Sequence, residues 1–176
     1  GDFGEALELA SNAIVRNAYH GKARALKCAA LRRLGRFTEA ARFAEETLEV
    51  DRLDFAAYYE LAQAQEALGD GSAADATLAK LRELTRGSAH VHLEVSTDYA
   101  EAGLWDEASD LLQMVVGGAA DSKSVHPMVY YHLGYYSRRR GDEAAARRWY
   151  ELASNADPDY CFPTRLYSIL VLEDAM

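Results

Sequence analysis

The chain of 176 residues is 49% hydrophobic and 27% charged, and its formal net charge at pH 7 is -9. This balance excludes a disordered segment, and no apolar run approaches the roughly 18 residues that a membrane-spanning helix needs. The acidic charge argues against a nucleic-acid partner, because phosphate binding requires a concentrated basic surface. Abundant alanine and only three prolines predict an all-α fold.

The cysteines and the start of the chain bear on the cellular compartment. Cys28 and Cys161 lie far apart and give neither a disulfide framework nor a metal-ligand spacing. The chain begins at Gly1 and shows no signal-peptide pattern. We expect a piece of a longer protein, located in the cytoplasm.

One sequence unit recurs along the chain. Its turn glycines are separated by 34, 34, 34 and 38 residues: Gly1, Gly35, Gly69, Gly103 and Gly141. An alanine follows five residues after each glycine: Ala6, Ala40, Ala74, Ala108 and Ala146. The unit predicts two amphipathic helices joined by a tight turn at the glycine, with the alanine where two helices approach closely.

The pattern predicts ten helices. In chain order they cover residues 2–16, 21–34, 37–50, 54–68, 71–86, 89–102, 105–118, 127–140, 142–156 and 162–175. The first belongs to a cut unit (1–20), and so does the last (161–176). Between them lie four complete units: 21–54, 55–88, 89–126 and 127–160. The unit 89–126 has four extra residues between Val116 and Pro127, which predict a loop or a longer helix end.

This unit resembles the tetratricopeptide repeat, a helix-turn-helix of 34 residues. Two copies carry its pattern best, namely Tyr58, Leu61, Ala62, Gly69 and Ala74, and Tyr130, Leu133, Gly134, Gly141, Ala146, Tyr150, Ala153 and Pro158. Arg24 and Lys27 depart from the pattern, because Tyr58 and Leu61 hold their positions one repeat later. The resemblance implies a right-handed α-α superhelix, or solenoid, that is open at both ends.

Each end helix is expected to expose an apolar face that a neighbouring unit would cover. These faces hold Ala6, Ala10, Ala13 and Ile14 at one end, and Phe162, Leu166, Ile169 and Leu170 at the other. We expect them to pack on more of the parent chain or on another molecule, which includes self-association.

A closer resemblance covers the whole chain. Stretches such as "HPMVYYHLGYYSRRRGDEAAARRWYELA" and "PDYCFPTRLYSILVLEDAM" are similar to the repeat region of large bacterial proteins that carry an N-terminal domain of unknown function. This resemblance implies a multidomain bacterial parent, in some cases linked to carbohydrate metabolism. It supplies no catalytic residue.

No catalytic or metal-binding constellation is evident in the sequence. Phosphate-binding and dinucleotide-binding motifs are absent, and no serine lies in a nucleophile elbow. His90 and His92 are two residues apart, so on a helix their rings point about 200° apart and cannot chelate one ion. His132 lies between tyrosines without an adjacent carboxylate, which favours a surface or groove position. We expect no enzymatic activity, no metal and no cofactor.

Candidate binding residues lie on the first helix of each unit, which lines the concave groove of such arrays. In the glycine register, Gly134 aligns with other small residues that pack between helices: Ser96, Ala62 and Cys28. Met128 faces the groove, with His90 as its equivalent. The predicted contact residues are Tyr59, Gln63, Glu66, Tyr131, Tyr135, Arg138 and Arg139. In the alternative, Arg138 and Arg139 only pair with Glu101 and Glu94.

Tyrosine and arginine are favoured anchors of protein interfaces, so we expect a protein-protein interaction scaffold that binds a peptide or a partner domain in the groove. Two alternatives stay open. One is an intramolecular arm that positions a carbohydrate-related domain of the same polypeptide, and the other is glycan or small-ligand binding at the tyrosine-rich end. Tyr135 aligns with Thr97, Gln63 and Ala29. With no asparagine at this position, recognition of a chaperone's C-terminal carboxylate is disfavoured.

Overall fold

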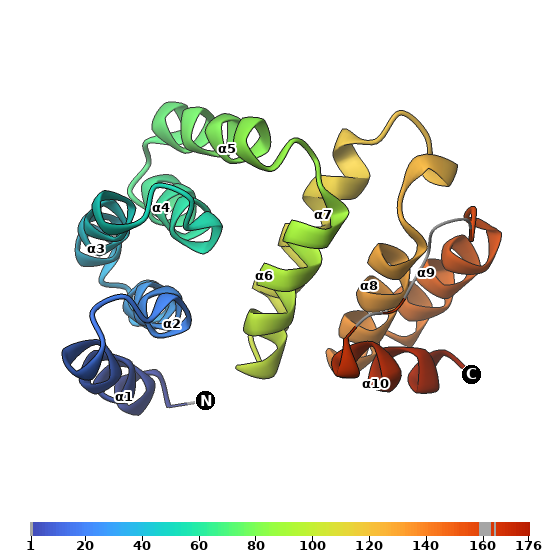
Figure 1. The fold of residues 1–176 in the computed structure, drawn as a ribbon, viewed down its shortest axis with the longest axis horizontal. Coiled ribbons are helices and arrows are strands. Elements are labelled where there is room, and N and C mark those ends of the chain that lie inside the picture. The colour runs from blue at the N-terminus through green and yellow to red at the C-terminus, as the bar shows by residue number, and fades with distance from the viewer. Residues whose placement is uncertain (1, 159–162, 164) are drawn as a thin grey trace. The chain divides into compact units, whose positions relative to one another are not determined.

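A computed structural model describes residues 2–158, 163 and 165–176. Within these residues the chain forms ten α-helices and one 3-10 helix, and no strand (Figure 1). The helices are α1 (Phe3–Arg16), α2 (Gly21–Arg33), α3 (Phe37–Val50), α4 (Phe55–Ala67), α5 (Gly71–Thr85), α6 (Ala89–Glu101), α7 (Trp105–Gly118), η1 (Ser122–Ser124), α8 (Pro127–Arg139), α9 (Glu143–Asn155) and α10 (Leu166–Ala175). The prediction of an all-α fold is confirmed.

The helix ends agree with the sequence prediction to within one residue, with one exception. Helix α10, predicted from residue 162, begins at Leu166. The backbone of Arg165 is extended, with φ -114° and ψ 144°, so the helix starts after it. The predicted contribution of Phe162 lies outside the described residues.

The four extra residues of the unit 89–126 accompany the short helix η1. A capping box closes it, in which the Asp121 carboxylate accepts from the backbone of Ser124 at 2.8 Å. The Tyr130 hydroxyl donates to the Ser122 carbonyl at 2.9 Å and ties this turn to α8. The insertion is therefore an ordered loop rather than a lengthened helix.

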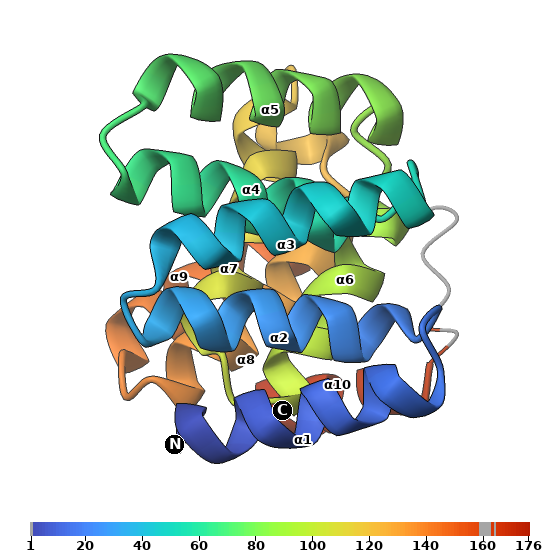
Figure 2. The ribbon, with the colours of Figure 1, turned by 90° about the vertical axis from the view of Figure 1, so that its left-hand side faces the viewer.

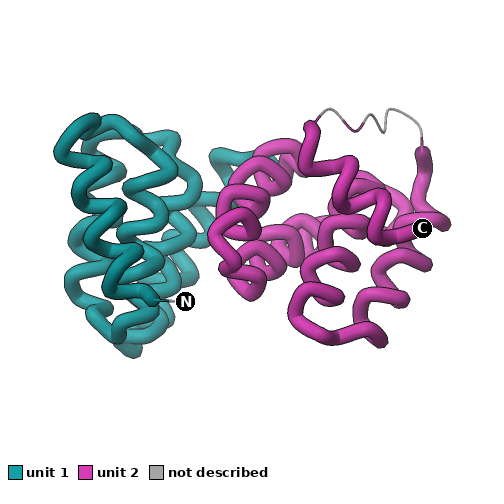
Figure 3. Tube along the Cα trace, turned by 90° about the horizontal axis from the view of Figure 1, so that it is seen from below, with its two compact units in different colours: residues 1–86 teal, residues 87–176 magenta. Residues whose placement is uncertain are grey.

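The chain forms two compact units, residues 1–86 and residues 87–176 (Figure 3). In unit 1, helices α1 to α5 pack on one another in chain order (Figure 2). A core that includes Cys28, Leu31, Phe43 and Leu61 joins α1 to α4. In unit 2, α8 contacts α6, α7, α9 and α10, so this helix is the centre around which unit 2 is built.

The same glycine turn ends the first helix of four hairpins. Gly35, Gly69, Gly103 and Gly141 have φ values of 74°, 84°, 75° and 83°, a left-handed conformation that glycine adopts without a steric penalty. The amide after each glycine donates to a carbonyl five residues back, as from Asp142 to Ser137 at 2.9 Å. This is the Schellman motif, and its repetition explains the period seen in the sequence.

The alanine of each hairpin lies at a close helix contact. Ala40, Ala74, Ala108 and Ala146 are all buried. Ala6, at the equivalent position of α1, is exposed. Gly134 of α8 lies against the ring of Tyr150 of α9, because a Cβ added there would overlap that ring.

The apolar faces of the end helices agree with the prediction at α10 and differ at α1. At α10, Leu166, Ile169 and Leu170 are exposed. At α1, Ala10 is buried and Ile14 packs against the core of unit 1, whereas Leu9 is exposed. Within the described ranges, every helix is too short or too polar to span a bilayer.

Candidate functional site

The predicted contact residues of unit 1 do not form an accessible set. Tyr59 is only 1% exposed, so its prediction as a groove residue is wrong. The adjacent Glu60 is 0% exposed and accepts two hydrogen bonds from Arg32, at 2.8 and 3.3 Å. Gln63 is half-buried and Glu66 is exposed. Tyr59 is therefore not accessible to a partner.

The predicted contact residues of unit 2 form one connected surface on α8. Tyr131 and Tyr135 are half-buried, and Arg139 is exposed. The Tyr135 ring meets Trp105 of α7 edge-on, with centroids 6.2 Å apart. The Arg139 guanidinium lies 5.3 Å from the Trp105 ring centroid and 6.0 Å from that of Tyr135, where cation–π attraction stabilises it. We call Tyr131, Tyr135 and Arg139 the α8 stripe.

Arg138 is held by partners other than those predicted. It forms ion pairs with Glu143 at 3.4 Å and with Asp174 of α10 at 3.2 Å. Glu94, one of the two acidic residues of the alternative interpretation, pairs with Arg165 at 3.2 Å. Arg138 therefore fastens α10 to α8 and contributes less to the accessible surface than Arg139 does.

The ring of Tyr150, on α9, packs against the α8 stripe. Its ring lies 6.3 Å from the ring of Tyr131, and its hydroxyl donates to the Asp174 carboxylate at 2.5 Å. Burial and this hydrogen bond raise the pKa of the Tyr150 hydroxyl, so it stays protonated. The contacts of Tyr150 and Arg138 order α8, α9 and α10 against one another.

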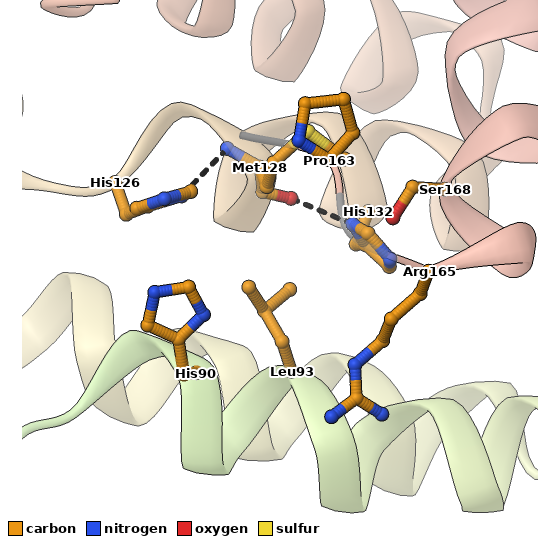
Figure 4. Close-up of a pocket in the computed structure, with 8 residues that line it drawn as sticks. All are labelled: His90, Leu93, His126, Met128, His132, Pro163, Arg165 and Ser168. Atoms are coloured by element: carbon orange, nitrogen blue, oxygen red, sulfur yellow. Dashed lines mark hydrogen bonds between the residues drawn. The ribbon is translucent and has the colours of Figure 1, made fainter. Parts of the chain in front are cut away.

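A small pocket lies at the other end of α8 (Figure 4). Its cavity measures about 20 Å³, and its lining includes His90 and Leu93 of α6, Met128 and His132 of α8, and Ser168 of α10. His126, the N-cap of α8, completes it. We call it the histidine pocket.

Both pocket histidines of α8 are bound to the backbone of Met128. The His126 Nδ1 accepts from the Met128 amide at 3.3 Å, and the His132 Nδ1 donates to the Met128 carbonyl at 2.7 Å (Figure 4). The prediction of a surface or groove position for His132 is wrong, because it is only 2% exposed. It lies between Tyr136 and Tyr167, with ring centroids 5.9 and 6.1 Å away.

Both rings are neutral at pH 7. Burial lowers the pKa of His132 to about 4. Burial, and then the charge of His90, lower the pKa of His126. No cluster of three or more histidine, cysteine or acidic side chains in the described part of the chain could hold a metal ion.

Sequence reasoning named His90 and Met128 as groove residues but missed the pocket. The signal that could have revealed it is "HP" at positions 126 and 127, because proline at the first helical position marks His126 as a cap.

The comparisons with known proteins agree with this architecture. A family model described as tetratricopeptide repeat matches residues 31–94, which include three buried small residues of the pattern and two of the glycine turns. Residues 31–94 therefore match the tetratricopeptide repeat. No curated protein matches its sequence.

Solved tetratricopeptide repeat structures resemble the chain at low sequence identity. The thermophilic TPR protein TTC0263 of Thermus thermophilus is 19% identical, with a TM-score of 0.50 over 99% of this chain and 91% of that one. MamA from Desulfovibrio magneticus RS-1 (residues 41 to the end) is 16% identical, with a TM-score of 0.47 over 91% and 88%. YrrB, described as a TPR protein with an unusual peptide-binding site, is 18% identical, with a TM-score of 0.43 over 98% and 83%. The likeness to TTC0263 supports the helical-repeat fold.

Proposed function

We propose that the chain is a non-catalytic interaction scaffold, in which unit 2 binds an extended segment of a protein partner along α8. The observation that carries this proposal is the α8 stripe. Its rings and guanidinium are partly exposed, yet contacts with Trp105, Tyr150 and Tyr167 hold them in place. Side chains that are ordered before binding lose little conformational entropy on binding, which favours affinity.

The chemistry of the surface favours a protein over other ligands. Tyrosine and arginine are the residue types that dominate protein interfaces energetically. The histidine pocket, at about 20 Å³, holds little more than one water molecule, so it does not enclose a sugar ring. Glu143 and Asp174 neutralise Arg138, and the chain carries a formal net charge of -9, which disfavours a polyphosphate ligand.

A peptide selection tests the proposal. Peptides are selected from a phage-displayed library on the whole chain, and their affinities are measured by fluorescence anisotropy. We expect Tyr135→Ala to weaken the selected peptides about tenfold or more, as loss of an interface tyrosine does. The matched control is Tyr19→Ala, because Tyr19 is an 80% exposed tyrosine of unit 1. The peptide affinities of this control should equal those of the unmodified chain.

The outcome separates the remaining alternatives. If no peptide is enriched, or if Tyr135→Ala and Tyr19→Ala have equal effects, the proposed site is wrong. If a domain of the same polypeptide, added as a separate protein, binds through Tyr135 and competes with the selected peptides, the chain is an intramolecular arm. Binding of oligosaccharides that depends on Tyr135 would instead favour a glycan site.

A further inference from the structure

Three consecutive arginines, at residues 138–140, form the C-terminal end of α8 and its C-cap. Arg138 forms ion pairs with two carboxylates, and Arg140 forms one with Asp106 at 2.8 Å. Within the described residues no carboxylate pairs with Arg139. Arg139 is therefore the guanidinium of this group that can bind an acid from outside the chain.

Two aromatic rings hold the Arg139 guanidinium in place. It lies 5.3 Å from the ring centroid of Trp105 and 6.0 Å from that of Tyr135. A guanidinium that stacks on an aromatic ring uses its flat face, so the N–H groups in its plane stay available to other partners. This planar fork of donors matches the two oxygens of a carboxylate. Because the rings already order the side chain, it loses less conformational entropy on binding.

The neighbouring Arg138 shows how this surface holds a carboxylate. Its guanidinium lies 5.5 Å from the ring centroid of Tyr150 and pairs with the carboxylate of Asp174, which belongs to α10. The Tyr150 hydroxyl donates to the same carboxylate. An arginine beside an aromatic ring thus binds an acid from another segment of this chain. Arg139 repeats the arginine–aromatic arrangement without a carboxylate from the described residues.

The overall charge of the chain limits which acidic ligands can bind. The formal net charge of -9 repels a run of acidic residues. A single carboxylate in contact with Arg139 depends on short-range attraction, because physiological salt screens exposed charges beyond roughly 8 Å. A segment with one acidic side chain among apolar ones fits this surface better than a polyanion.

The α8 stripe also sets the distance between that acid and an apolar side chain. Tyr131 lies eight residues before Arg139, which corresponds to about 12 Å along the helix axis. An extended segment covers this length in about four residues, at roughly 3.3 Å each. The half-buried Tyr131 ring, which packs on Tyr150, offers the apolar contact at the other end.

We propose that the α8 stripe selects a segment with an aspartate or glutamate side chain that binds Arg139. The carboxylate oxygens accept from the Arg139 N–H groups, and an apolar side chain about four residues away packs on Tyr131. The inference rests on the proposed function, since it names the chemistry of the segment that unit 2 binds.

A double-mutant cycle between the whole chain and its peptides tests this contact. The probes are the peptides from the phage selection, displayed as N-terminal fusions and then synthesised with amidated C-termini, so that no terminal carboxylate contributes. Each acidic residue of a peptide is replaced by its amide, Asp by Asn or Glu by Gln. We expect one position where this replacement weakens binding about three- to tenfold, measured by fluorescence anisotropy.

The Arg139→Gln variant should weaken the original peptide by a similar factor. Combined with the amide replacement, it should weaken binding little further, because both changes remove the same contact. Arg148→Gln is the matched control. Arg148 is exposed on α9 of the same unit and forms no ion pair or ring contact within the described residues, so its loss changes the net charge equally. Its effect should stay below about twofold, in keeping with a charge that touches no ligand.

Three results would overturn the proposal: selected peptides that tolerate the amide at every acidic position, equal effects of Arg139→Gln and Arg148→Gln, or additive effects of Arg139→Gln and the amide replacement. Peptides that depend on Tyr135 but need no acid would reject this inference and leave the proposed function standing. An absence of enriched peptides would reject both.

Discussion

The two units place different chemistry at the same repeat positions. Tyr59 in α4 and Tyr131 in α8 share one register position, yet Tyr59 is buried and Tyr131 is half-exposed. The next position holds Glu60 in unit 1 and His132 in unit 2, and both are buried. Arg32 pairs with the Glu60 carboxylate. Of the two ring nitrogens of His132, the Nδ1 is the one that bonds to the Met128 carbonyl.

This difference teaches that the backbone and the binding surface are specified by separate residues. The glycine turns and the buried alanines are common to both units and fix the hairpins. The remaining first-helix positions are free to vary. In unit 1 these positions hold the buried ion pair of Arg32 and Glu60. In unit 2 they hold aromatic rings and a histidine that lines the pocket.

The largest expected effect concerns the ion pair of unit 1. Glu60→Ala removes the buried carboxylate that accepts two hydrogen bonds from Arg32, and we expect unit 1 to lose about 3–5 kcal/mol of stability, as in other broken buried ion pairs. Hydrogen exchange of segments from α2 and α4 measures this loss. The control is Glu143→Ala in unit 2, which removes a 59% exposed partner of Arg138 and should cost about 0–1 kcal/mol. Equal losses of stability in the two variants would contradict the expectation that the buried ion pair of unit 1 contributes more than the exposed ion pair of unit 2.

Acid should destabilise unit 2 through His132. The folded chain keeps this ring neutral down to about pH 4, whereas the unfolded chain protonates it near its ordinary pKa of 6.5. Stability therefore falls as the pH drops from 6.5 towards 4, by roughly 3 kcal/mol in total. Asp54 in unit 1 acts in the opposite direction, because burial raises its pKa and acid favours its folded form.

Urea denaturation at several pH values, followed by tryptophan fluorescence, reports on unit 2, since Trp105 and Trp149 both lie there. His132→Leu removes the titrating ring, so its stability should depend less on pH than that of the unmodified chain. An identical pH profile in the two proteins would show that His132 is not the group responsible.

The smallest expected effect compares two small residues in register. Gly134→Ala places a Cβ into the ring of Tyr150; overpacking costs about 1–3 kcal/mol and alanine regains about 1 kcal/mol in helix propensity, so we expect unit 2 to lose about 1 kcal/mol. Ala62→Gly, at the equivalent buried position of unit 1, should cost about 1 kcal/mol through helix propensity alone. Urea denaturation measures both changes. A gain of about 1 kcal/mol in stability for Gly134→Ala would mean that Tyr150 moves aside without cost.

The sequence predicted the fold well because its determinants are local. A glycine that must adopt a positive φ and an alanine that must fit between helices leave a period that can be counted directly, and the helix ends follow from them. The late start of α10 could not be predicted, because the period places a first helix there and gives no sign that Arg165 is extended.

The site was predicted only in part, because exposure depends on residues from several helices. Helical register assigned Tyr59 and Tyr131 to one side of their helices, but which of them reaches solvent is decided by packing around α4 and α8. The histidine pocket draws on α6, α8 and α10. No single stretch of sequence carries that combination.

The most direct test of the account is hydrogen exchange of the whole chain with and without a peptide from the phage selection. We predict slower exchange on binding in α6, α8 and α10, at residues 89–101, 127–139 and 166–175, and no change in α2 and α4. Protection confined to α2 and α4, or absent from α8, would contradict the claim that unit 2 holds the binding surface.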